Sequence, residues 1–450
     1  MVRVLVPSGA LGLGYDRAAL ARGVAARPDI IAIDGGSTDS GPHYLGTGTS
    51  KYSRSVTRAE WAELMTAQAE AGVPLVIGTA GTCGADDAVD WLLDITREVV
   101  AETGRAVRVA VLKSGQSPAA MAEALQAGDI APLPHAPQID AKLLAGCTNI
   151  VALAGAEQIN AALATGADIV IAGRTTDTAI IAALPLARGC HPGAAWHGAK
   201  VGECGALATT QPGSGVIQLD FDETGFEMTP MAEGVRATPR TVSAHMLYEN
   251  TDPFILYEPG GHLDVTGARY TALDKRRVRV EGSRWVPSDT YTVKLEGARL
   301  AGYQTVSLVT LRDPRYVTHV QQWCDDIRTR ALAKVCDRLG RDDIAVELRV
   351  IGANATLGAL EDAPMTAPEV GVMAIVTAPT DALSREVAKM LNPYLLHHPL
   401  TPDEEMPTFA FPFSPPELPR GAVYEFCLNH VLRLDDPMSA FRLTVEEIAP

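Results

Sequence analysis

The residues near the N-terminus that are best suited to chemistry follow the apolar residues 30–33 (Ile-Ile-Ala-Ile). One acid, two glycines and two hydroxyl residues come next, namely Asp34, Gly35, Gly36, Ser37 and Thr38. Glycines and short polar side chains let a ligand approach the backbone closely. A carboxyl group buried at a strand end can have its pKa shifted toward general acid/base work. We therefore expect Asp34 to be catalytic and its four neighbours to contact the substrate.

Two cations, Lys113 and Arg174, each follow a different apolar segment. A cation beside glycine-rich backbone suits a carboxylate or a phosphate on a ligand. We expect both side chains to bind the carboxylate of the substrate, together with Thr79 and Asp177. The alternative is that Arg174 and Asp177 form an ion pair that caps the following helix, and the two roles are compatible.

Residues 202–205 (Gly-Glu-Cys-Gly) and 258–264 (Glu-Pro-Gly-Gly-His-Leu-Asp) carry further reactive groups. We expect Glu203 to act as an acid or base, with His262 as its partner acid. The alternative for His262 is a loop histidine on a glycine turn. Because an adjacent carboxylate raises the pKa of a thiol, the sequence disfavours Cys204 as a nucleophile.

Two kinds of cofactor can be considered from the residues, a divalent metal ion and NAD or a flavin. Oxygen and nitrogen ligands from Asp34, Asp39 and His43 would suit a divalent metal ion, whereas the alternative is that Asp39 caps a turn and His43 lies in a loop. Residues 9–14 (GALGLG) have the spacing G-x-x-G-x-G instead of the dinucleotide fingerprint G-x-G-x-x-G, although Asp34 loosely fits the acidic position of that motif. The sequence therefore leaves a metal open and disfavours NAD or a flavin.

These groups must be positioned by alternating strands and helices in the first half of the chain. Short apolar segments alternate with helical periodicity, which predicts a parallel sheet with helices on both faces. The predicted strands are residues 3–6, 30–33, 74–77, 108–112, 149–153 and 168–172, and the predicted helices are residues 15–26, 58–71, 86–103, 117–126 and 156–165. Ligands bind at the carboxyl ends of such strands, so we expect all six strand ends to share one edge and form a crevice.

The composition changes near residue 206, where we place a domain boundary. Residues 1–206 are expected to form an α/β ligand-binding domain, and residues 207–450 an α+β domain with a proline-rich C-terminal segment. Strands are predicted at 270–273, 277–281, 291–295, 304–311, 344–351, 370–378 and 424–430, and helices at 317–339 and 381–391. The proline-dense residues 408–419 are expected to form neither a helix nor a central strand.

The net charge of −16 over 450 residues argues against nucleic acid or an anionic membrane as a partner. No apolar run reaches the roughly 18 residues that a membrane span needs, and no signal peptide is recognised. Seven cysteines without a C-x-x-C pair indicate reduced thiols and a cytoplasmic protein. Cys83 lies at a predicted helix N-terminus. There are two alternatives for its role: a reactive thiol, or a small buried side chain. By base rate, we expect a homo-oligomer.

Four segments together resemble the acyclic terpene utilisation (AtuA-like) family: residues 149–186, 202–215, 258–267 and 411–432. The resemblance runs over most of the chain. It implies a cytoplasmic catabolic enzyme for small carboxylates or their CoA thioesters. The matched residues to which the resemblance gives a role are Arg174, Asp177, Glu203, Cys204, Glu258 and Asp264.

The chain departs from this family at one motif. The family segment GH-x-x-E-C has its histidine where this chain has Lys200, and His197 is the nearby alternative. The favoured hypothesis is a lyase or hydro-lyase acting on a small carboxylic acid or acyl-CoA thioester. The alternatives are an NAD-type oxidoreductase and a non-catalytic subunit for ligand binding or assembly.

Overall fold

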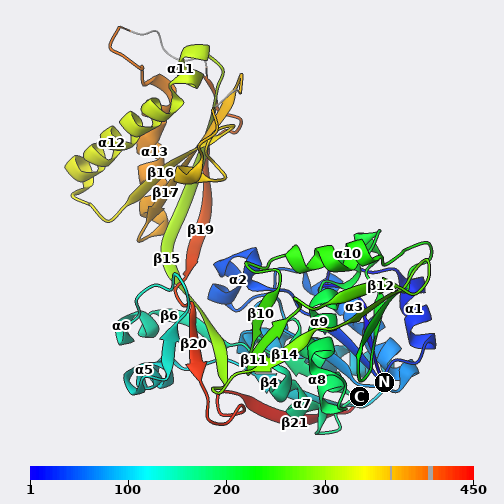
Figure 1. Ribbon diagram of the computed structural model, residues 1–450. Coiled ribbons are helices and arrows are strands. Elements are labelled where there is room, and N and C mark those ends of the chain that lie inside the picture. The colour runs from blue at the N-terminus through cyan, green and yellow to red at the C-terminus, as the bar shows by residue number, and fades with distance from the viewer. Residues whose placement is uncertain (365–366, 404–408) are drawn as a thin grey trace. The chain divides into compact units, whose positions relative to one another are not determined.

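The structure is a computed structural model that describes residues 1–364, 367–403 and 409–450. The chain forms two compact units, one of residues 1–299 with 425–450 and the other of residues 300–424. It leaves the first unit within strand β15 (Thr292–Leu311) and returns within β19 (Glu417–Phe426). The second unit is therefore an insertion in the first (Figure 1).

A ten-stranded sheet forms the centre of the first unit. Its middle is parallel and confirms the mixed α/β prediction, in the order β1 (Val2–Val6), β2 (Ile30–Asp34), β3 (Leu75–Gly78), β7 (Ile169–Ala172) and β4 (Val107–Lys113). These five carboxyl ends share one edge, because parallel strands run in the same direction.

Helices cover both faces of this sheet. One face packs on α1 (Arg17–Ala25), α3 (Arg54–Ala71) and α4 (Asp86–Thr103), and the other on α7 (Ala156–Leu163), α8 (Ala179–Ala187) and α9 (Pro192–Gly202). Successive residues of a strand point to opposite faces of the sheet. Ile31 and Ile33 pack in the core with α1, α3 and α4, whereas Ile30 and Ala32 pack in the core with α7, α8 and α9. Because both faces of these strands are buried, their sequences are nearly continuous apolar runs.

Antiparallel strands extend the sheet on both sides. Beyond β1 lie β8 (Ile217–Phe221), β9 (Gly225–Pro230), β13 (Val278–Glu281) and β12 (Arg269–Ala272), and beyond β4 lies β21 (Arg442–Ile448). The boundary expected near residue 206 therefore does not separate the two compact units. Since β8 pairs along the whole of β1, residues 207–299 belong to the first unit.

The strand expected at residues 149–153 forms as β6 (Cys147–Ala152), but it pairs antiparallel with β15 and not within the parallel sheet. The prediction that six strand ends share one sheet edge was therefore wrong for this strand. Its end still reaches the edge, because Ala154 forms a parallel bridge with Thr175 just after β7.

The remaining elements of the first unit are short. A three-stranded sheet contains β10 (Ile255–Glu258), β11 (Gly261–Asp264) and β14 (Arg284–Pro287), while β5 (Ile130–Pro132) and β20 (His430–Arg433) continue the sheet of β15. The other helices are α2 (Pro42–Thr47), α5 (Pro118–Ala127), α6 (Ala141–Ala145) and α10 (Pro239–Ala244).

In the second unit, β15 pairs with β17 (Val370–Ala378) and β18 (Phe409–Ala410), and β17 pairs with β16 (Ala345–Ile351). The other elements are α11 (Pro314–Thr318), α12 (Val320–Leu339) and α13 (Asp381–His397), and α12 and α13 cover the sheet. The strands expected at 291–295 and 304–311 are one continuous strand, and the strand expected at 424–430 is interrupted after Phe426. Residue 408 of the proline-dense segment lies outside the described residues.

The turn after β3 must approach the backbone after β7 closely. Gly84 has a φ of +65°, and a Cβ atom there would lie 2.2 Å from the backbone nitrogen of Arg174. That nitrogen donates a hydrogen bond of 3.1 Å to the carbonyl oxygen of Gly84. Only glycine fits, because both the positive φ and the close contact exclude a side chain.

Substituting Gly84→Ala should lower the free energy of unfolding more than Gly104→Ala does. Gly104 has nearly the same φ, +67°, but nothing lies within 4 Å of its Cβ position. The difference between the variants isolates the steric clash, and we expect about 1–3 kcal/mol. Urea denaturation followed by circular dichroism measures it, and equal losses would contradict this packing.

Candidate functional site

The glycine-rich strand ends pack against one another. A Cβ atom on Gly35 would lie 2.2 Å from the carbonyl oxygen of Thr79, and one on Gly78 would lie 2.3 Å from the hydroxyl of Thr175. These glycines therefore serve close backbone packing. Five residues at these strand ends were predicted to contact the substrate: Gly35, Gly36, Ser37, Thr38 and Thr79. They line neither of the two cavities described below.

Arg174, just after β7, forms a buried ion pair with Glu296 on β15. The Nε of Arg174 lies 3.0 Å from Oε2 of Glu296, its Nη2 lies 3.4 Å from Oε1, and each side chain is 8% exposed. Burial opposes ionisation of Glu296, but Arg174 and Lys294 outweigh it and lower the pKa of Glu296 to about 2. The guanidinium thus has a carboxylate partner within the chain, and no local motif marks Glu296 in the sequence.

Other groups complete the surroundings of Arg174. Its Nη1 donates to the Thr79 hydroxyl at 3.1 Å and lies 3.5 Å from Asp177, as the predicted ion pair requires. The Thr38 hydroxyl donates to Glu296 at 3.1 Å. Thr38 and Thr79 therefore support the ion pair.

Lys113 does not join Arg174. Its ammonium lies 2.7 Å from the carboxylate of Asp90 on α4, so its charge is already paired. Because β4 continues into the antiparallel pair with β21, Lys113 lies opposite Arg442.

A cavity of about 490 Å³, here called the acidic cavity, lies in the first unit. It brings together four residues named from the sequence, Arg174, Asp177, Glu203 and Glu258. Its other lining residues are Leu153, Thr176, Thr178, Lys200, Glu249, Asn250, Thr251, Asp252, Ile255, Leu256 and Tyr257. The cavity thus places these three acids near Arg174, together with Lys200, which was not predicted from the sequence as a site residue.

Three carboxyl groups of this cavity, those of Asp177, Glu203 and Glu258, retain protons more readily than ordinary acids. Burial raises the pKa of Glu258 to about 7, against opposing hydrogen bonds from Thr178 and Thr176. Burial also raises the pKa of Glu203 to about 8, although Lys200 opposes it as an ion-pair partner. Burial raises the pKa of Asp177 as well.

Asp34 is the last residue of β2, and Asp177 and Arg174 are its charged neighbours. It is 3% exposed, its Oδ2 accepts a hydrogen bond from the Gly36 nitrogen at 3.0 Å, and its Oδ1 has no partner in the described part of the chain. Burial and the nearby Asp177 raise its pKa. Asp34 therefore has the electrostatics of a functional carboxyl, but it lines neither cavity.

A second cavity of about 600 Å³, here called the apolar cavity, has mostly apolar walls. It includes His262, Lys294 and the side of the β10–β11 hairpin, and it shares Leu153, Thr176, Tyr257 and Glu258 with the acidic cavity. Glu258 thus lies on the wall of both, with its Oε1 accepting a hydrogen bond of 2.5 Å from Thr178. Among described atoms, Oε2 of Glu258 is buried without a hydrogen-bond partner.

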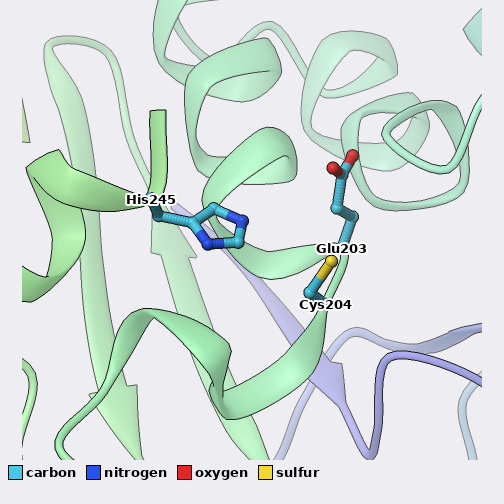
Figure 2. Close-up of side chains that lie close together, drawn as sticks. All are labelled: Glu203, Cys204 and His245. Atoms are coloured by element: carbon cyan, nitrogen blue, oxygen red, sulfur yellow. The ribbon is translucent and has the colours of Figure 1, made fainter. Parts of the chain in front are cut away.

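Cys204, Glu203 and His245 form a separate group at the end of α9 (Figure 2). Their potential ligand atoms all lie within 4.8 Å of one another. The expected metal set of Asp34, Asp39 and His43 is not gathered in this way among the described residues, and Asp39 and His43 are exposed. His245 was missed, because it comes from a segment with no recognisable motif.

His197 does not replace the histidine of the family motif. Its Nδ1 lies 2.7 Å from the Ser283 hydroxyl and its Nε2 3.2 Å from the Tyr270 hydroxyl, deep in the core. Burial lowers its pKa to about 3. His245 is the histidine that meets Glu203 and Cys204 instead.

Three further candidates lie away from the cavities. The carboxylate of Glu60 accepts a hydrogen bond of 2.7 Å from the nitrogen of Gly12, so a protein carboxylate already occupies the glycine-rich loop at 9–14. Cys83 is buried, and burial raises its pKa, as expected for an inert thiol. Asp264 pairs with Arg284 at 2.5 Å.

Within the described part of the chain, no helix has both the length and the apolar character needed to cross a membrane.

The fold and the site define an α/β protein with a carboxyl-rich cavity at the carboxyl edge of a parallel sheet. The chain belongs to the family described as acyclic terpene utilisation family protein AtuA, whose model matches residues 46–211 and 209–403. The match includes Arg174, Glu203, His245 and Glu258, and Asp34 lies outside it. No curated protein and no solved structure shows significant similarity to the chain.

Replacing Glu296 by Gln should strongly destabilise the protein, because Arg174 would be left buried without its carboxylate. Breaking such a pair costs about 3–5 kcal/mol. A matched control is Glu102→Gln, which removes the ion pair of Arg58 with an exposed glutamate, for a loss of about 0–1 kcal/mol. Urea denaturation compares both variants with the parent, and similar small losses would contradict the role of the pair.

Glu258 should make the protein less stable as the pH rises. Its pKa is about 7 in the folded protein against an ordinary value of 4.5, so stability falls between these pH values and then stays low. Glu258→Gln removes this dependence. The free energy of unfolding of the variant minus that of the parent should therefore increase by on the order of 3 kcal/mol from pH 4.5 to pH 8. Urea denaturation across this range tests the slope, which Glu102→Gln should leave unchanged.

Proposed function

We propose that this protein is a lyase or hydro-lyase that moves a proton beside the carbonyl carbon of an acyl substrate, with Glu258 as the proton-transfer group. The single observation that carries the proposal is the place of Glu258 on the wall shared by the acidic and apolar cavities. One of its carboxyl oxygens is fixed by Thr178, and the other is buried without a partner among the described atoms. In this proposal, that unpaired oxygen receives the substrate proton.

The chemistry of Glu258 supports this role. A group with a pKa of about 7 is present in both protonation states near neutral pH, which is the condition for effective general acid/base catalysis. In the dehydration of a β-hydroxyacyl substrate, Glu258 would take the α-proton, and the C–H electrons would form the double bond. The β-hydroxyl would leave as water with a proton from Asp177, whose pKa burial also raises.

The charges favour a thioester over a free carboxylic acid. Arg174 is paired with Glu296, Lys200 with Glu203 and Lys113 with Asp90. Arg174 and Lys113 were expected to bind a substrate carboxylate, but both already have a carboxylate partner, and so does Lys200. A thioester carbonyl carries no charge and therefore fits beside several acids.

The apolar cavity supports an acyl chain as the other half of the substrate. Its volume of about 600 Å³ lies within the usual range for a small-molecule site. Membership of a family described by acyclic terpene utilisation agrees with a branched apolar chain. A dinucleotide is less favoured, since Glu60 holds the backbone nitrogen of Gly12.

Deuterium exchange follows the proton transfer alone and therefore tests the proposal whichever bond the complete reaction breaks. The purified chain is incubated in ²H₂O with a panel of saturated, unsaturated and β-hydroxyacyl CoA thioesters and their free acids. Mass spectrometry should show deuterium at the α-carbon of at least one thioester, and Glu258→Gln should reduce the exchange rate at least a hundredfold. The Glu102→Gln control should exchange like the parent.

Two results would overturn the proposal. One is exchange that proceeds equally in the Glu258→Gln variant. The other is binding of a thioester with no exchange and no turnover, which would support a non-catalytic ligand-binding role instead.

A further inference from the structure

Glu203, Cys204 and His245 lie close together, and the proposed proton transfer by Glu258 uses none of them. Glu203 and Cys204 follow directly after α9, and His245 begins the short turn His245–Leu247 after α10. A carboxylate, a thiol and an imidazole are thus brought within 4.8 Å of one another from two segments. Acidic residues gather for many reasons, but this mixed set is typical of a transition-metal site.

His245 gives independent evidence for a missing partner. The side chain is 4% exposed, and its Nε2 is buried with no hydrogen-bond partner among the described residues. Buried polar nitrogens are nearly always paired in folded proteins. Figure 2 shows the imidazole pointing toward Cys204 and Glu203, so the unpaired nitrogen faces the other two potential ligands.

We propose that Glu203, Cys204 and His245 bind one zinc ion at the wall of the acidic cavity. Zinc accepts thiolate sulfur, imidazole nitrogen and carboxylate oxygen, and catalytic zinc sites have three protein ligands with a fourth position open. Glu203 lines the acidic cavity, so the open position would face a ligand there. Copper(I) prefers sulfur ligands and magnesium prefers oxygen, and neither preference matches this set as well.

The geometry requires only a small adjustment. Tetrahedral bonds of about 2.0–2.3 Å place ligand atoms roughly 3.3–3.8 Å apart, so the side chains would move together by about an ångström. The ion pair with Lys200 uses Oε1 of Glu203, which leaves Oε2 as the ligand atom. On binding, the thiol proton of Cys204 passes to solvent and the thiolate bonds the metal.

The surrounding charges favour a cation. Asp177 and Glu258 both act on Glu203 as negative neighbours, and Lys200 is the opposing positive one. Two charges of the ion would be balanced by Glu203 and the Cys204 thiolate. Glu203 would then hold the metal, which leaves proton transfer to Glu258. This inference goes beyond the proposed function and does not rest on it.

Direct metal analysis tests the site. The full chain is treated with chelator, incubated with excess Zn²⁺, dialysed and measured by inductively coupled plasma mass spectrometry. We expect one zinc per chain in the parent and less than a tenth of that in Cys204→Ser and in His245→Gln. Matched controls are Cys427→Ser, a buried thiol elsewhere, and His135→Gln, an exposed histidine, which should both retain one zinc.

Cobalt binding can be measured in the parent protein, so this test does not depend on whether a variant that lacks a metal ligand folds. Co²⁺ bound by the parent should show a thiolate-to-metal charge-transfer band in the near ultraviolet, and the band should persist in Cys427→Ser. A parent that holds no zinc after dialysis, or a cobalt complex without this band, would refute the site. Full zinc retention in folded Cys204→Ser and His245→Gln would refute it equally.

Discussion

The buried ion pair of Arg174 and Glu296 is the interaction on which the site depends. A charge in the interior is tolerated only with a partner and hydrogen bonds, and each of these side chains supplies the other's partner. The pair joins the end of the parallel strand β7 to the antiparallel strand β15. Arg174 borders the acidic cavity, and Lys294, two residues before Glu296, borders the apolar one. The ion pair thus connects two strands that each contribute to the surroundings of a cavity.

The sequence predicts the central sheet well, because a strand covered on both faces must be apolar throughout and local periodicity reveals it. It also identifies Arg174, Asp177, Glu203 and Glu258, which the structure brings together. Partners that come from far along the chain leave no local signal, and Glu296 stands 122 residues from Arg174. The close backbone contact of Gly35 was not predicted for a related reason: a glycine required by a ligand and one required by neighbouring backbone look the same in a sequence.

The acidic cavity illustrates how burial controls charge. Several carboxyl groups lie close together, and two effects reduce their repulsion. Burial raises the pKa of Glu203 and Glu258, so these groups retain protons more readily, and Arg174 and Lys200 place positive charge beside Asp177 and Glu203. Such a site can accept a cation or an uncharged polar group with little electrostatic penalty, whereas a second anion would meet repulsion. The proposed thioester and the proposed zinc ion are the two kinds of occupant that this balance admits.

The point at which the chain leaves and re-enters the first unit has an evolutionary consequence. Arg299 and Glu425, the residues that flank the insertion, lie 2.5 Å apart as an ion pair. The ends of the inserted segment are thus held together by the host unit, and the entropy of closing an inserted loop grows only slowly with its length. No described residue of 300–424 lines either cavity. The length of the inserted unit can therefore change without removing any described wall residue of the two cavities.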